Sequence, residues 1–181
     1  MTRALFVTLV LAALPVAAAA QTPPSAGPTA SARARPDCSA AEHHQFDFWL
    51  GRWRVTAAGQ PAGSSHIESV MQGCGVLEHW SSAGGGNGTS LNFYDRRTKT
   101  WSQAWIDESG NALHLSGTFA DGRMVLASAP RQTDAGIDVQ RITWSKAGEK
   151  NVRQLWESST DGGTTWTVAF DGTYTPQGAP Q

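Results

Sequence analysis

The chain has 181 residues, with 14 lysines and arginines against 15 aspartates and glutamates, and a formal net charge of −1. A chain so close to neutral has no electrostatic footprint for nucleic acid or for an anionic membrane surface. We therefore expect no nucleic-acid partner.

The first 20 residues have the features of a secretory signal. Arg3 supplies a positive start, residues 4–14 form an apolar run, and Ala18-Ala19-Ala20 precedes Gln21 as a small-residue cleavage site. The apolar run is too short to span a bilayer as a helix, and the alternative is a retained N-terminal anchor. We predict export to the periplasm or the extracellular space, with no membrane span.

Residues 21–36 contain proline, alanine, serine and arginine but no large apolar side chain. Such a segment cannot bury enough surface to become ordered, so we predict a disordered linker. One domain is expected at 37–176, with a disordered tail at 177–181.

Two cysteines, Cys38 and Cys74, remain in the predicted exported chain. An oxidising compartment favours a disulfide between them, which would stabilise the fold by roughly 3–4 kcal/mol on the chain-entropy model. Two free thiols are the alternative.

Residues 43–55 are denser in aromatic rings than any other segment, with Phe46, Phe48, Trp49 and Trp53 close together around a turn at Gly51. Burying one such ring contributes roughly 1.5–3 kcal/mol. We interpret the segment as a structural plug, a short turn or helix that closes one end of a β-barrel and leads into its first strand.

From Arg52 onward the hydrophobic period is two, interrupted by turn residues. Short links imply antiparallel neighbours, and a meander of ten strands leaves exposed edges unless the sheet closes. We predict an all-β, up-and-down barrel of about ten strands, with a sandwich as the alternative. The strands are expected near 52–58, 64–73, 75–82, 88–94, 99–106, 112–119, 122–128, 137–145, 151–158 and 164–174.

Apolar residues share strand faces that we expect to line the barrel. Examples are Leu91 with Phe93, Trp101 with Trp105, and Val152 with Trp156. The polar residues Gln103, Arg141 and Gln154 fall in the same register, and Glu78 shares a face with Trp80. Such groups need partners inside a barrel.

These inner polar groups have two interpretations: a hydrogen-bond network that fixes the barrel, or a cavity in which they orient an apolar guest. Glu78 would neutralise Arg141 inside. The candidate ligand-binding residues are Glu78, Trp101, Gln103, Trp105, Arg141, Gln154 and Trp156.

The segment Ser159–Trp166 fits the pattern S-x-D-x-G-x-T-W and resembles the Asp-box of sialidase-type propellers. That motif is a hairpin brace in which the aspartate bonds turn amides and the tryptophan packs beneath. Because it occurs once, we expect a structural turn around Asp161 and Trp166 and no glycosidase activity.

The sequence has no catalytic or metal-binding pattern such as H-E-x-x-H, G-x-S-x-G or a P-loop, and its five histidines are scattered. No carboxylate pair has a spacing that requires acid–base chemistry. We therefore expect no metal site, no cofactor and no catalytic residue. The glycine run at 84–88 is expected to be a flexible loop, with a lid over the barrel mouth as a further possibility.

The Gly51-Arg52-Trp53 segment after an aromatic turn resembles the lipocalin and calycin signature. With FDFWLGRW, GCGVLEHW, WSQAWID, VRQLWESSTDGGTTW and FDGTY, it makes the domain similar to a bacterial family of exported calycin-like proteins of unknown function. The resemblance implies that Trp53 packs against a basic residue, Arg141 or Arg153, and that the barrel holds at most a small ligand. A haem site of the nitrobindin type needs a late histidine, whereas the last one here is His114.

The sequence thus leaves three functional hypotheses. The first is a barrel that binds a small hydrophobic or amphipathic ligand. The second is a structural or interaction module with a filled core, and the third is an enzyme that uses Glu78 beside Arg141 on a lipid or isoprenoid. The oligomeric state is left open.

Overall fold

The computed structural model describes residues 37–178. The predicted signal, the predicted linker and the last three residues lie outside this range. Among the described residues, no helix is long and apolar enough to cross a membrane.

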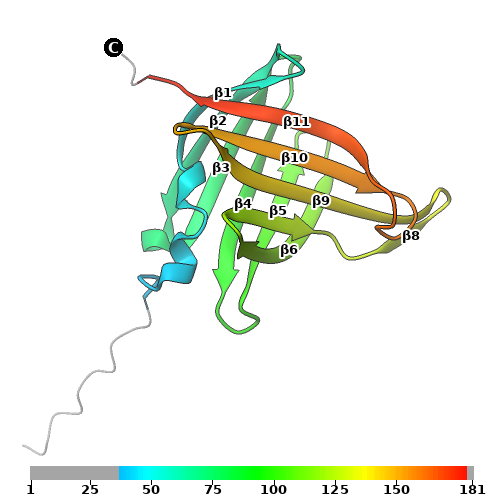
Figure 1. Ribbon diagram of the computed structural model, residues 1–181, viewed down its shortest axis with the longest axis horizontal. Helices are drawn as coiled ribbons and strands as arrows, with labels where there is room; N and C mark the ends of the chain where they lie inside the picture. Colours follow the sequence, from blue (N-terminus) through cyan, green and yellow to red (C-terminus); the bar gives the residue numbers. More distant parts are fainter. Residues whose placement is uncertain (1–36, 179–181) are drawn as a thin grey trace, which may run out of the picture. The chain divides into compact units, whose positions relative to one another are not determined.

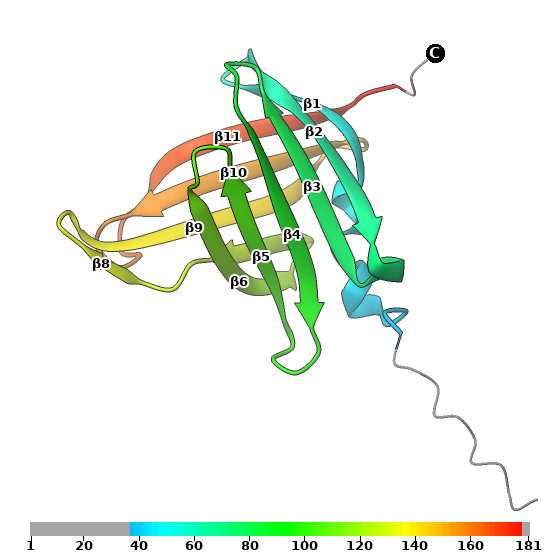
Figure 2. The same cartoon turned by 180° about the vertical axis from the view of Figure 1, so that it is seen from behind.

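Ten antiparallel strands form a closed barrel, as the sequence predicted (Figures 1 and 2). Strands β1 to β7 follow in sequence order, β7 pairs with β9, and β9, β10 and β11 complete the circle back to β1. The strand β8 is an addition that pairs only with β9. The elements are η1 (Ala41–His44), η2 (Asp47–Trp49), β1 (Gly51–Ala57), β2 (Gln60–Val70), η3 (Met71–Gly73), β3 (Gly75–Ser82), β4 (Asn87–Asp95), β5 (Thr100–Asp107), β6 (Ala112–Ala120), β7 (Arg123–Ala127), β8 (Arg131–Thr133), β9 (Gly136–Ala147), β10 (Asn151–Ser159) and β11 (Thr167–Pro176).

The first hairpin is tighter than the sequence suggested. The second strand was expected to begin near residue 64, but β2 already begins at Gln60, and Pro61 pairs with Thr56. The register shifts between Val55 and Thr56. A bulge of this kind accommodates a proline, which cannot donate to the ladder, within a strand.

The faces of β4 are the reverse of the expected ones. Leu91 and Phe93 lie on the outer face with 42% and 38% of their surface exposed, whereas Ser90 and Asn92 are fully buried. Alternation shows which residues share a face but not which face points inward. Hydrogen bonds from Asn92 to Ser90 and from Gln103 to Asn92 make the polar face of β4 the inner one.

The N-terminal turns form the predicted plug at one end of the barrel. Phe46 and Trp49 are fully buried and stacked, with ring centroids 4.9 Å apart. Trp101 and Trp144 pack edge-on against Phe46, at 5.6 and 5.2 Å. Phe48 is partly buried and lies 6.1 Å from Phe119.

Trp53 joins the plug to β1. Its indole N–H donates to the Trp49 carbonyl at 2.9 Å, and its ring lies edge-on to Tyr174 at 6.3 Å. Gly51 enters β1 with a φ of +137°, a conformation that side chains with a Cβ rarely adopt.

The expected basic partner of Trp53 is neither of the two candidates. Arg153 donates to the Asp171 carboxylate at 2.7 Å, and Arg141 donates to Glu157. Both guanidinium groups lie on the outer face, because the residues that alternate with them on β9 and β10 point inward. The closed end of this barrel is therefore built from aromatic contacts.

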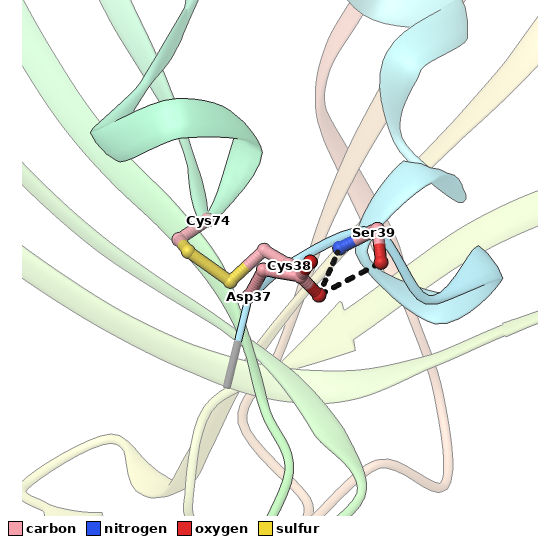
Figure 3. Close-up of a disulfide and its surroundings, with 4 residues drawn as sticks. All are labelled: Asp37, Cys38, Ser39 and Cys74. Carbon is pink, nitrogen blue, oxygen red and sulfur yellow. Dashed lines mark hydrogen bonds between the residues drawn. A yellow bond between two sulfur atoms is a disulfide. The ribbon is translucent and has the colours of Figure 1, made fainter. Parts of the chain in front are cut away.

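The predicted disulfide links Cys38 to Cys74 (Figure 3). It joins the start of the described chain, before η1, to the residue that follows η3 at the end of β2. The two cysteines are 36 residues apart in the sequence. It fastens the segment that carries the plug to the barrel wall.

We predict that Trp53→Ala lowers the free energy of unfolding by about 3–5 kcal/mol, because it leaves a cavity beside Trp49 and Tyr174 and an unpaired carbonyl. Urea denaturation measures the change. Phe93→Ala, on the outer face, is the control and should cost less than about 1 kcal/mol. Equal losses in the two variants would contradict the structural role of Trp53.

Candidate functional site

The barrel holds a cavity of about 250 Å³ toward the end opposite the plug. Its walls are mostly apolar, five of the eleven lining residues are aromatic, and its polar groups are few, as in small-molecule binding sites. The lining residues are Glu78, Trp80, Gln103, Trp105, Leu113, Ile142, Gln154, Trp156, Ala169, Phe170 and Tyr174.

Five of the seven candidate residues meet in this cavity, namely Glu78, Gln103, Trp105, Gln154 and Trp156. Trp101 lies elsewhere, at the plug, where its indole N–H donates to the Gln45 side-chain oxygen at 3.0 Å. Trp101 and Trp105 thus share a face of β5 but lie at different depths of the lumen.

Arg141 lies on the outer face, so its predicted inward position is wrong. Its guanidinium donates to Glu157 at 2.9 and 3.1 Å and lies 3.8 Å from the centre of the Trp166 ring. The prediction took its register from Val139, and Val139 and Arg141 do share a face, but it is the outer one, where Val139 is buried beside Ser159 and apart from the main core. The inner face of β9 carries Ile142 and Trp144, so Arg141 points outward and away from Glu78.

Glu78 is the only acid among the cavity-lining residues, and it is 5% exposed. Its two carboxyl oxygens accept hydrogen bonds from Ser65 at 3.1 Å and from Ser90 at 2.9 Å. Burial raises the pKa of this carboxyl group to about 7, and the bonds from Ser90 and Ser65 oppose the rise.

A polar strip continues from Glu78 across the inner wall. The Asn92 amide donates to Ser90 at 3.0 Å and to the Val76 carbonyl at 3.1 Å, and the Gln103 amide donates to Asn92 at 2.8 Å. The expected hydrogen-bond network is therefore present. It also holds Gln103 at the cavity surface, so the two interpretations of the polar residues are compatible.

Sequence reasoning missed Tyr174 as a site residue. Its hydroxyl donates to the Gln154 side-chain oxygen and so orients that amide. Burial, and then the nearby Glu78 carboxylate, raise the pKa of Tyr174 well above its usual value. Alternation along β11 from Phe170 would have placed Tyr174 on the inner face.

Three strand glycines make room for the aromatic walls. A Cβ at Gly88 would overlap the Trp105 ring, and one at Gly172 would overlap the Phe170 ring. At Gly63 the overlap would be with Trp80 and a neighbouring carbonyl. Because these glycines have no side chain, the rings approach the backbone closely and are held in one orientation. The glycines therefore position the cavity walls.

A groove of about 710 Å³ adjoins the cavity and shares Trp105, Leu113 and Trp156 with it. It opens beyond Ala127, where β7 stops pairing with β6 and the chain continues along β9 through Ser128 and β8. Its other lining residues are Asp107, Asn111, Ala112, His114, Ser128, Ala129, Pro130, Arg131, Asp138 and Gln140.

The turn between β10 and β11 has the expected Asp-box contacts. The Asp161 carboxylate accepts the Thr164 and Thr165 amides at 2.9 Å and the Thr165 hydroxyl at 2.6 Å. These bonds hold the pKa of Asp161 well below its usual range. Trp166 folds back to donate to the Gly163 carbonyl at 3.0 Å. The motif braces the hairpin that ends beside the cavity.

Within residues 37–178 there is no group of three or more potential metal ligands. His44 bonds Asp47 at 2.8 Å, as a surface residue of the plug. Its neighbour His43 is buried instead, edge-on to Tyr94 at 5.3 Å, and neither ring nitrogen has a hydrogen-bond partner among the described residues.

Comparison of the chain with protein-family models and with curated proteins gives no match. The resemblance to exported calycin-like proteins therefore stays a prediction, and the site is interpreted from its geometry.

We predict that Glu78 makes stability fall as the pH rises between about 4.5 and 7. The folded protein holds this proton more tightly than the unfolded chain, whose glutamate pKa is near 4.5. The contribution of Glu78 to the free energy of unfolding is therefore largest below pH 4.5, falls between pH 4.5 and 7, and stays constant at higher pH. The total loss is about 3 kcal/mol.

Urea denaturation of the wild type and Glu78→Gln across this range measures the effect, because all other titrating groups are common to both proteins. Glu149→Gln, in the exposed β9–β10 turn, is the control and should follow the wild type. Parallel curves for the wild type and Glu78→Gln would contradict a buried carboxyl with a raised pKa.

Proposed function

We propose that this protein binds a small, largely apolar ligand in the open part of its barrel. The observation that carries the proposal is the cavity of about 250 Å³, lined by five aromatic residues and bordered by a few oriented polar groups. Binding sites for small molecules combine these two properties.

The volume of the cavity limits the size of the ligand. A dry cavity of about 150 Å³ holds one benzene molecule, so the space here suits a guest of roughly ten non-hydrogen atoms. A long-chain fatty acid or a retinoid is larger and would extend into the adjoining groove.

The polar groups would orient the guest. The Gln103 and Gln154 side chains and the Glu78 carboxyl group border the cavity and are held by neighbours within the barrel. A group that is fixed before the ligand arrives loses little entropy on binding.

The two other hypotheses have less support. The hypothesis of a filled core fits the plug end, where rings pack closely, but the barrel contains a cavity toward the other end. An enzyme that uses Glu78 beside Arg141 lacks this pair, because Arg141 lies outside the barrel with Glu157. Export and localisation stay predictions from the N-terminal sequence.

We predict that the purified protein binds naphthalene, whose size matches the cavity, with quenching of tryptophan fluorescence. Leu113→Trp fills the cavity from its wall and should weaken binding at least tenfold. Leu91→Trp makes the same substitution on the outer face and should bind like the wild type.

Native mass spectrometry of the purified protein is the complementary measurement, since a retained guest appears as added mass. If neither naphthalene nor a broad panel of small apolar compounds binds, the proposed function is wrong. If Leu113→Trp binds as well as Leu91→Trp, the ligand lies elsewhere.

A further inference from the structure

The cavity combines a buried carboxyl group with aromatic walls. We infer that its guest is a small organic cation, an amine or quaternary ammonium compound, whose charge lies against Glu78 and whose apolar body lies between the rings. This inference rests on the proposed function and adds the chemical class of the ligand.

The protein supplies no cation for Glu78. The carboxylate accepts two neutral hydroxyl groups, Ser65 and Ser90, and none of the described residues that line the cavity is lysine, arginine or histidine. Arg141 and Arg153, on β9 and β10, are paired outside the barrel with Glu157 and Asp171. A buried carboxylate without a counter-charge is costly, so a cationic guest would be strongly favoured.

The groups that face Glu78 allow this contact. From β2 and β4 come the two serine hydroxyls, from β5 the Gln103 amide, from β10 the Gln154 amide and from β11 the Tyr174 phenol. Tyr174 is the only other titratable group among them, and it stays protonated because burial raises its pKa. Each carboxylate oxygen accepts one hydroxyl and has a lone pair left for an ammonium group.

The aromatic walls suit a cation as well. Trp80, Trp105 and Trp156 border the cavity together with Phe170, and the Trp80 and Phe170 rings are edge-on to each other at 6.4 Å. Aromatic faces attract ammonium groups, and the attraction is largest for tryptophan and in desolvated sites. The same carboxylate would repel an anionic guest such as a fatty acid.

The charges of the groove that adjoins the cavity do not repel a cation. Asp107 and Asp138 carry negative charge there, and the single arginine, Arg131, lies 3.5 Å from Asp138 as an ion pair. His114 is the remaining titratable residue of the groove. At neutral pH the groove has no excess of positive charge.

The test compares two probes of equal shape, benzyltrimethylammonium and its uncharged carbon analogue neopentylbenzene. Isothermal titration calorimetry at pH 8 should show at least tenfold tighter binding of the cation by the wild type. In Glu78→Gln the ratio of the two affinities should fall to about one. Since the readout is this ratio, a general change of cavity shape cancels. Glu149→Gln is the surface control and should keep the wild-type ratio.

The pH provides a second readout. Benzyltrimethylammonium does not titrate, so its affinity should fall about tenfold for each pH unit below 7, as Glu78 becomes protonated. Neopentylbenzene should show no such trend. Near pH 6.5, binding of the cation should release protons, which titrations in buffers of different ionisation enthalpy detect.

Three results would overturn the inference. Binding of neopentylbenzene as tight as that of the cation, with naphthalene also bound, rejects the cation preference and leaves the proposed function intact. An unchanged affinity ratio in Glu78→Gln shows that the charge does not lie against Glu78. Absence of binding by either probe and by naphthalene rejects the proposed function and this inference together.

Discussion

The packing of the plug into one end of the barrel is the constraint on which the rest of the structure depends. Phe46 and Trp49 lie among Trp101 and Trp144, so four rings fill the lumen where β1 begins. The Trp53 indole and the Cys38 disulfide tie this segment to β1 and to the end of β2. Because that end is filled, the cavity lies toward the other one, and its position follows from the position of the plug.

The inner wall beyond the plug carries a hydrogen-bonded polar strip. Glu78, Ser90, Asn92 and Gln103 come from three consecutive strands and bond one another in a sequence of short contacts. Apolar side chains at these positions would fill the lumen without the cost of burying a carboxyl group. A buried acid with a raised pKa, in contact with a cavity, is typical of a site that binds or reacts, and such sites commonly reduce stability.

Access to the cavity also comes from backbone features. Glycines at 63, 88 and 172 let aromatic rings approach the backbone closely, and this close contact fixes the orientation of the rings. Beyond Ala127 the chain pairs with β9 through β8 and no longer with β6. The groove forms there. Two of the turns between strands are braced by side chains. The Asn87 amide donates to Glu108 at 2.6 Å, and Asp161 braces the β10–β11 hairpin.

The sequence by itself determined the barrel, its ten strands, the plug, the disulfide and the Asp-box turn, because each depends on a local pattern or a chemical preference. Alternation and turn residues specify strands, clustered rings specify a buried segment, and two cysteines have only each other as partners. It also identified five of the residues that line the cavity, since they share strand faces with tryptophans.

The tertiary structure alone decided which face of β4 points inward, where Arg141 and Trp101 lie, and that Tyr174 joins the site. The physical reason is that a period of two is symmetric between the faces of a strand. The inward face is chosen by contacts between strands, such as the hydrogen bonds that join Ser65, Glu78 and Ser90. Burial does not decide the question either, because Val139 is buried on the outer face of β9 and Ile142 on the inner one, and the local sequence does not distinguish them.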